Sequence, residues 1–160
     1  MARLISIFNG PNLNLLGERE PEIYGSVTLQ AIEESCRSFS ASLNIELDFQ
    51  QTNHEGVMVD AIQAARLTSD ALIINPAGLS FHSVPVLDAL RIFGKPIVEL
   101  HLSNIHARDE AHRHSIMSSS ATAVICGLGA YGYIIALQAA ARLFGPLEDE
   151  LPEPIRTGPI

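Results

Sequence analysis

The 160-residue chain is poor in basic residues and has almost no lysine. Ten Lys and Arg stand against eighteen Asp and Glu, which gives a net charge of -8 and a pI near 5.1. Nucleic-acid binding depends on clustered Lys and Arg that displace counterions from the phosphate backbone. We therefore expect no nucleic-acid partner, and the lack of a basic run also argues against recruitment to a membrane surface.

The one lysine, Lys95, precedes Pro96 at the start of a predicted strand. Ligands bind beyond the carboxyl ends of the strands in a parallel sheet, so Lys95 lies at the wrong end of the sheet for a site. Catalysis through a lysine Schiff base is therefore excluded.

Cysteine and long hydrophobic segments are also scarce. Cys36 and Cys126 fall at predicted core-facing positions, where cysteine acts as a small hydrophobe and not as a disulfide partner or nucleophile. The apolar run in the N-terminal segment MARLISIFNG is too short for a signal peptide. Gln138 and Arg142 interrupt the apolar segment 127–144, which favours an amphipathic helix over a membrane span. We expect a cytoplasmic protein.

Short β-rich runs alternate with helical patterns along the chain, as in βαβ units around a parallel sheet. The expected strands are Leu4–Phe8, Ile45–Gln50, Ala71–Asn75, Ile97–His101 and Ala123–Gly127. Helical patterns occupy residues 28–43, 56–67, 83–94 and 130–144, with Thr28 as an N-cap. Five parallel strands covered on both faces predict a flavodoxin-like three-layer α/β sandwich. We expect one catalytic domain over residues 1–144 and a Pro-rich tail at 145–160.

The loops after the strands hold most of the polar chemistry. They cover residues 9–25, 52–56, 75–83, 101–115 and 127–132, and they contain all six histidines. The loop at 9–25 is too polar and too broken for a helix or a strand, and it carries Arg19 and Tyr24. The loop at 101–115 carries Arg108 and Arg113. Because the carboxyl ends of parallel strands meet at one edge of the sheet, these side chains predict a small-molecule site.

Nucleotide and metal cofactors fit this edge poorly. Pro11, in the turn NGPN after the first strand, removes a backbone donor that a phosphate site would use. The segment GLGAYG at 127–132 matches GxGxxG, but it follows the last strand and opens no further βαβ unit. Four closely spaced histidines lack both the i, i+4 spacing of a metal-binding helix and a carboxylate cluster: His101, His106, His112 and His114. We expect no cofactor and no metal.

Two residue pairs are suited to proton transfer. Arg19 precedes Tyr24 by five residues in one loop, and Glu99 precedes His101 by two residues on one strand. Positions 99 and 101 point to the same face of a strand, so the Glu99 carboxylate can orient the His101 imidazole. A phenol is mostly protonated at neutral pH, and a nearby guanidinium such as that of Arg19 favours its phenolate. The pairs therefore predict a general base and a general acid.

Three segments, NGPNLNLLGEREPEIYGSVTL, TNHEG and HLSNIHAR, resemble the signature segments of type II 3-dehydroquinate dehydratases. The similarity runs from about residue 4 to residue 142. The resemblance implies a flavodoxin-like subunit assembled as a homo-dodecamer of four trimers. It also implies cofactor-free conversion of a small-molecule substrate, 3-dehydroquinate, to 3-dehydroshikimate and water in the shikimate pathway of aromatic amino acid biosynthesis.

The resemblance also implies roles for individual residues in an anti elimination through an enolate. Tyr24 is expected to remove a C2 proton, with Arg19 as its activator on a mobile lid. Asn12 is expected to stabilise the enolate oxygen, and His101, oriented by Glu99, to protonate the departing C1 hydroxyl. Contacts to the substrate's carboxylate and ring oxygens are assigned to Asn75, Leu102 and Ser103, and a contact to a neighbouring subunit's site is assigned to Asp88.

Two stretches depart from the family pattern. Phe81 stands where the family usually has a substrate-binding His, and His82 follows it. His112 stands where the family usually has Arg, and Arg113 follows it. We therefore expect His82 and Arg113 to bind substrate. Two alternatives remain open: a paralogue that dehydrates a related cyclic β-hydroxy ketone acid, and a non-catalytic protein that binds the ring acid.

Overall fold

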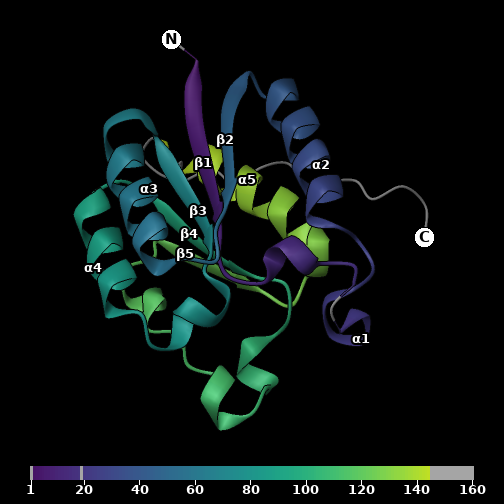
Figure 1. Ribbon diagram of the computed structural model, residues 1–160. Helices are drawn as coiled ribbons and strands as arrows, with labels where there is room; N and C mark the ends of the chain where they lie inside the picture. Colours follow the sequence, from purple (N-terminus) through teal and green to yellow (C-terminus); the bar gives the residue numbers. More distant parts are fainter. Residues whose placement is uncertain (1, 19, 145–160) are drawn as a thin grey trace.

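The computed structural model describes residues 2–18 and 20–144. Five parallel strands form one sheet in the order β2-β1-β3-β4-β5 (Figure 1). The strands are β1 (Arg3–Asn9), β2 (Ile45–Gln51), β3 (Ala71–Asn75), β4 (Ile97–His101) and β5 (Ala123–Cys126). This order is that of the flavodoxin-like fold, and each strand lies within one residue of its predicted bounds.

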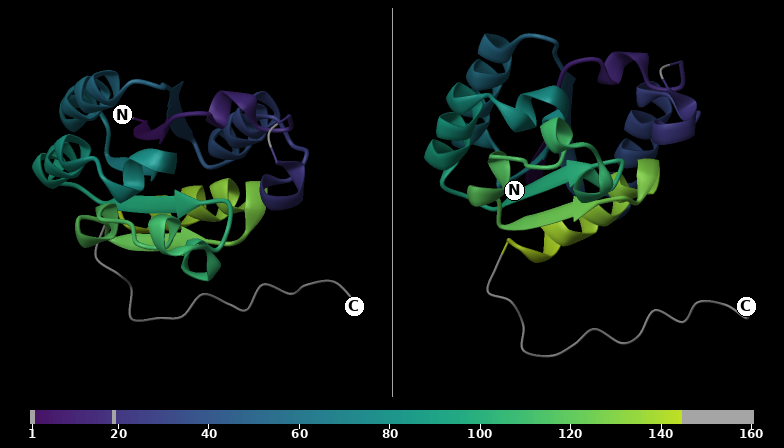
Figure 2. Two further views of the ribbon diagram at one scale, coloured as in Figure 1. Left: turned by 60° about the horizontal axis from the view of Figure 1, so that its bottom comes forward. Right: turned by 90° about the horizontal axis from the view of Figure 1, so that it is seen from below.

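Two pairs of helices cover the two faces of the sheet (Figure 2). α2 (Leu29–Ser42) and α5 (Gly132–Arg142) pack on one face, and α3 (Glu55–Thr68) and α4 (Val84–Phe93) pack on the other. The N-cap prediction is confirmed, because the Thr28 hydroxyl accepts a hydrogen bond from the backbone N–H of Ala31. The last helix is shorter than predicted, because residues Gly129–Tyr131 form a separate 3-10 turn before it.

The strands are buried on both faces, as parallel strands between two helix layers must be. Along β1, Ile5 and Ile7 face α2 and α5, whereas Phe8 faces α3 and α4. Cys36 is buried in the core between the sheet and the helices α2 and α5. Burial raises the pKa of its thiol to about 12, in agreement with an apolar role. The core prediction for Cys126 is wrong: this residue is only half-buried, because it ends an edge strand.

The loop after β1 is more structured than its composition predicts. It contains a 3-10 turn at Leu13–Leu15 and the short helix α1 (Pro21–Tyr24), so the expectation of a loop without helix is wrong. Leu13 and Leu16 are buried in the core and anchor the segment through packing, which a polar composition does not reveal. Arg19 and the tail at 145–160 lie outside the described residues.

Gly10 lets the loops after β1 and β3 approach each other. Its backbone N–H donates to the carbonyl of Asn75 at 2.8 Å. A Cβ at position 10 would lie 2.2 Å from the carbonyl oxygen of Pro76, which is a severe clash. The close approach brings Asn12 and Asn75 to the same edge of the sheet. Within the described part of the chain, none of the helices has the length and apolar character that crossing a membrane requires.

Candidate active site

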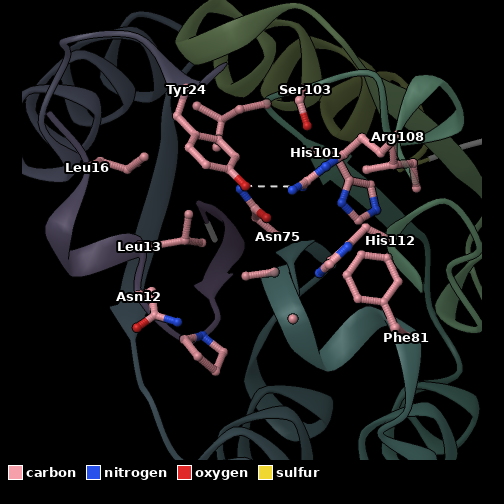
Figure 3. Close-up of a pocket in the computed structure, with 15 residues that line it drawn as sticks. Asn12, Leu13, Leu16, Tyr24, Asn75, Phe81, His101, Ser103, Arg108 and His112 are labelled. Carbon is pink, nitrogen blue, oxygen red and sulfur yellow. Dashed lines mark hydrogen bonds between the residues drawn. The ribbon is translucent and has the colours of Figure 1, made fainter. Parts of the chain in front are cut away.

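A pocket of about 270 Å³ lies at the carboxyl edge of the sheet, where the sequence places the polar loops (Figure 3). Its lining comes from the loops after β1, β3 and β4 and from the last residues of β3 and β4, Asn75 and His101. The strand order reverses between β1 and β3, so this is the topological switch point at which such folds bind ligands. The polar and aromatic lining residues are Asn12, Tyr24, Asn75, Phe81, His101, Ser103, Arg108 and His112.

The structure brings six of the predicted site residues to this pocket: Asn12, Tyr24, Asn75, His101, Leu102 and Ser103. Three predicted ligands lie outside its lining. His82 is exposed, Asp88 is exposed on α4 within 3.5 Å of Arg91, and Arg113 pairs with Glu110. At the two positions that depart from the family pattern, Phe81 and His112 themselves line the pocket.

His101 and Glu99 form a buried pair at the end of β4. The His101 Nε2 atom lies 2.6 Å from the Glu99 carboxylate, and the two side chains are 5% and 0% exposed. With Glu99 ionised, Nε2 carries the proton of the neutral imidazole and donates a hydrogen bond to the carboxylate. Nδ1 is then the ring nitrogen that is available to a ligand, and it can deliver a proton when the imidazole is charged.

The surroundings of Glu99 favour its ionised form. Burial by itself raises the pKa of this carboxyl, but hydrogen bonds from His101, Ser115 and Ser118 outweigh it and hold the pKa below its ordinary value. The Ser118 hydroxyl donates to the second carboxylate oxygen at 2.6 Å. Glu99 is therefore a fixed negative charge behind the imidazole, and it stabilises the positive charge that His101 carries as an acid.

Tyr24, the last residue of α1, points its hydroxyl into the pocket (Figure 3). The Arg108 guanidinium donates a hydrogen bond to that hydroxyl at 3.1 Å and lies 5.8 Å from the centre of the ring. The sequence predicts Arg108 at this edge but assigns it no role. The signal was present, since Arg108 ends the family-like segment HLSNIHAR, but its partner is 84 positions away.

Phe81 and His112 form one wall of the pocket. Their rings pack edge to face with centroids 5.4 Å apart. The His112 Nδ1 atom lies 2.8 Å from both carboxylate oxygens of Asp109, and this hydrogen bond holds the pKa of Asp109 below its ordinary value. Nδ1 is thus committed to Asp109, and Nε2 is the nitrogen that remains for a ligand.

The backbone of the pocket is held in conformations that are uncommon for residues other than glycine. Asn12 and Ala77, both in the lining, have φ angles of 68° and 49°. The backbone N–H of Asn12 donates to the side chain of Asn53 at 2.9 Å, which ties the loops after β1 and β2 together. Such strained residues cluster where a site requires them.

The charge of the pocket favours an anionic ligand. Among the described lining residues Arg108 is permanently cationic, and none is Asp or Glu. Over residues 2–18 and 20–144, no three His, Cys, Asp or Glu side chains gather closely enough to hold a metal ion. The arrangement offers an acid, a hydroxyl under a guanidinium and amide groups to a small acidic molecule.

Comparison with known proteins finds relatives over most of the chain. The chain matches the family described as dehydroquinase class II over residues 3–141. It is 52% identical over 142 residues to a catabolic 3-dehydroquinase of Verticillium alfalfae, covering 89% of this chain and 95% of the relative. It is 52% identical over 133 residues to a 3-dehydroquinate dehydratase of Dinoroseobacter shibae, covering 83% and 89%.

A solved structure, the type II dehydroquinase from Butyrivibrio crossotus, superposes with a TM-score of 0.86 at 34% identity. That match covers 88% of this chain and 98% of the solved chain. The sequence match and the structural match both extend over nearly the whole described part of the chain. The chain therefore belongs to the class II dehydroquinase family.

Proposed function

We propose that the protein dehydrates 3-dehydroquinate to 3-dehydroshikimate by anti elimination through an enolate, without a cofactor. The observation that carries this proposal is one pocket that holds both a hydroxyl under a guanidinium, Tyr24 with Arg108, and an imidazole backed by a buried carboxylate, His101 with Glu99. The names of the two relatives, catabolic 3-dehydroquinase and 3-dehydroquinate dehydratase, support the same reaction.

Proton removal falls to Tyr24 in this proposal. Its phenolate takes a proton from C2 of the substrate, and the C–H electron pair moves into an enolate. The hydrogen bond from Arg108 stabilises the phenolate, because a charge-assisted donor favours the ionised acceptor. We propose that Arg19 adds a second positive charge from the lid formed by the loop after β1.

Loss of water falls to His101. The carbonyl re-forms from the enolate, a new double bond forms between C1 and C2 as the C1–O bond breaks, and the charged imidazole protonates the departing hydroxyl through Nδ1. Glu99 stabilises the imidazolium at Nε2. Asn12 stabilises the enolate oxygen, directly or through one water. The products are one conjugated enone acid and one water.

Binding of the substrate uses the pocket's amides and its positive charge. Asn75 and Leu102 are buried and Ser103 is half-buried. We propose that the three bind the carboxylate and ring oxygens, Leu102 and Ser103 through backbone and hydroxyl groups and Asn75 through its side-chain amide to a ring hydroxyl. We assign no contact to His82 or Arg113, since both lie outside the lining.

The test of this function is ultraviolet absorbance of the conjugated enone when the purified full-length protein meets 3-dehydroquinate. An enzyme-dependent rise, with loss of one water from the substrate by mass spectrometry, supports the proposal. Folded protein that gives no rise contradicts it and revives the non-catalytic alternative. Binding of 3-dehydroquinate by calorimetry then separates a ring-acid-binding protein from one that does not recognise the substrate.

A second candidate substrate is favoured by the wall of Phe81 and His112. A phenyl ring makes no hydrogen bond to a ring hydroxyl, so a related cyclic β-hydroxy ketone acid with a less polar edge fits this wall better. The double variant with Phe81→His and His112→Arg puts the family's His and Arg at these two positions. If it raises kcat/KM for 3-dehydroquinate by more than about 100-fold, the wild-type pocket serves another ring acid; an equal or lower value keeps 3-dehydroquinate as the substrate.

The proposal also includes assembly and location. We propose one catalytic domain over residues 1–144, a homo-dodecamer of four trimers, and a cytoplasmic location. Asp88 on the exposed face of α4 then reaches the site of a neighbouring subunit. Sedimentation velocity tests the assembly: a species of about twelve times the 17.3 kDa chain is expected, and a stable monomer contradicts it. Relatives named as catabolic and as dehydratase occur at the same identity, so their names assign no pathway direction.

A further inference from the structure

A network of buried polar groups lies beneath the pocket, and the proposed mechanism uses only one of them, Asn75. Tyr133 on α5 is 0% exposed, and its hydroxyl lies between the side chains of Asn9 and Asn75. These two asparagines end the adjacent strands β1 and β3 and are paired in register. The Tyr133 hydroxyl lies 2.7 Å from Asn9 Oδ1 and 3.0 Å from Asn75 Nδ2.

The backbone carbonyl of Gln50, at one end of this network, fixes the direction of every hydrogen bond in it. The backbone carbonyl of Gln50 can only accept, and Asn9 Nδ2 donates to it at 3.0 Å. The other end of the Asn9 amide is therefore Oδ1, which accepts the single proton of the Tyr133 hydroxyl. The Tyr133 oxygen must then accept from its second neighbour, so the NH₂ end of Asn75 faces Tyr133.

Tyr133 cannot reverse this order by losing its proton. Burial raises the pKa of its phenol far above the ordinary value, so the hydroxyl stays protonated. Asn75 Nδ2 is thereby held against Tyr133. The Oδ1 atom of Asn75 makes no hydrogen bond within the described residues and is not sealed from the pocket, which Asn75 lines.

We propose that Tyr133 is a positioning residue that acts through Asn75. It fixes the Asn75 amide so that Oδ1 faces the ligand as a hydrogen-bond acceptor, and the ligand group that it recognises is a hydroxyl donor. This inference rests on the proposed function for the identity of the ligand, a hydroxylated ring acid. The fixed amide avoids an entropic cost on binding, and it rejects ligands that place an acceptor at this point.

The variant Tyr133→Phe removes the hydroxyl and keeps the buried ring. We expect kcat/KM for 3-dehydroquinate to fall roughly 10- to 100-fold, since one amide loses its fixed orientation and Asn9 Oδ1 loses its donor. The effect must pass through Asn75. In an Asn75→Ala background, Tyr133→Phe should therefore change kcat/KM by less than about threefold. Additive effects of the two substitutions contradict the proposal, as does an unchanged kcat/KM in folded Tyr133→Phe.

A matched control is Ser6→Ala, on the same strand as Asn9. Ser6 is 1% exposed and its hydroxyl lies 2.7 Å from that of Ser69, but neither residue lines the pocket. We expect Ser6→Ala to lower stability and to leave kcat/KM unchanged. A loss of kcat/KM equal to that of Tyr133→Phe would show that any buried hydroxyl has the same effect, and would overturn the positioning role.

Two further measurements separate this inference from folding failure and from failure of the proposed function. Asn9→Ala removes the acceptor that holds the Tyr133 proton, so it should reproduce the Tyr133→Phe loss if that variant does not fold. The side-chain amide signals of Asn75 in a ¹H–¹⁵N spectrum, assigned by their loss in Asn75→Ala, need no substrate. They should show slow hydrogen exchange in the wild type and fast exchange in Tyr133→Phe or Asn9→Ala. Equal exchange rates in a folded variant overturn the inference even if wild type fails to turn over 3-dehydroquinate.

Discussion

The Arg108 guanidinium donates a hydrogen bond to the Tyr24 hydroxyl and so joins the loop after β4 to the loop after β1. Arg108→Gln removes the charge and keeps an N–H donor, so it should leave the fold intact and destabilise the phenolate. A charge-assisted hydrogen bond contributes about 1.5 to 3 kcal/mol, which predicts a loss of roughly 10- to 150-fold in kcat/KM.

Steady-state kinetics with 3-dehydroquinate checks this prediction, and Arg108→Lys should give an intermediate rate because it keeps the charge without the planar fork. Arg37→Gln is the matched control, since Arg37 is exposed on α2 and pairs with Glu33 away from the pocket. Wild-type kcat/KM in Arg108→Gln would contradict a role for Arg108 in activating Tyr24.

Stability should depend on pH through Glu99. The fold holds the pKa of Glu99 below the ordinary value of 4.5, so folding favours the ionised carboxylate. The stabilisation is complete above the unfolded-state pKa and is lost as the pH falls through the lower folded-state pKa. The free energy of unfolding of wild type, relative to that of Glu99→Gln, should therefore be highest above the ordinary pKa of 4.5 and decrease as the pH falls below that value.

Urea unfolding of both proteins across this pH range checks the prediction for Glu99. Glu46→Gln serves as the control, because Glu46 is exposed on β2. A stability difference between wild type and Glu99→Gln that grows as the pH falls would have the wrong sign. Activity offers a second readout, since Glu99→Gln deprives the imidazolium of its partner and should lower kcat by roughly 10² to 10⁴.

Lys95 should be dispensable for the reaction. Its ammonium donates to the backbone carbonyl of Ser69 and lies at the amino end of β4, on the opposite edge of the sheet from the pocket. Lys95→Arg should keep kcat/KM within about threefold of wild type, as a surface substitution does. Treatment with borohydride in the presence of substrate should leave no adduct by mass spectrometry. An adduct on Lys95 would mean that catalysis uses a Schiff base after all.

The parts of the fold and site that follow from local spacing could be predicted from the sequence. The five strands are short apolar runs bounded by loops, and Thr28 is the N-cap at the start of a helical pattern. The contact of Glu99 with His101 could be predicted for the same reason, because residues two apart on a strand share a face.

The parts of the fold and site that depend on packing between distant segments could not be predicted from the sequence. Helix α1 is four residues long, and the segment before it is anchored by the buried side chains of Leu13 and Leu16 rather than by helix propensity. The contact of Arg108 with Tyr24 spans 84 positions, and that of Tyr133 with Asn75 spans 58. The sequence shows that such residues are present, but only the fold brings them together.

Tyr24 is the proposed base of the elimination, and the loss of its hydroxyl tests this role. Initial rates of enone formation are compared for folded wild type, Tyr24→Phe and Tyr131→Phe. Each variant differs from wild type by one hydroxyl. Tyr131 is 63% exposed and lies outside the pocket lining, so Tyr131→Phe controls for the substitution itself. The account predicts a loss of at least about 10²-fold in Tyr24→Phe and wild-type rates in Tyr131→Phe. Tyr24→Phe that turns over 3-dehydroquinate at the wild-type rate would contradict it.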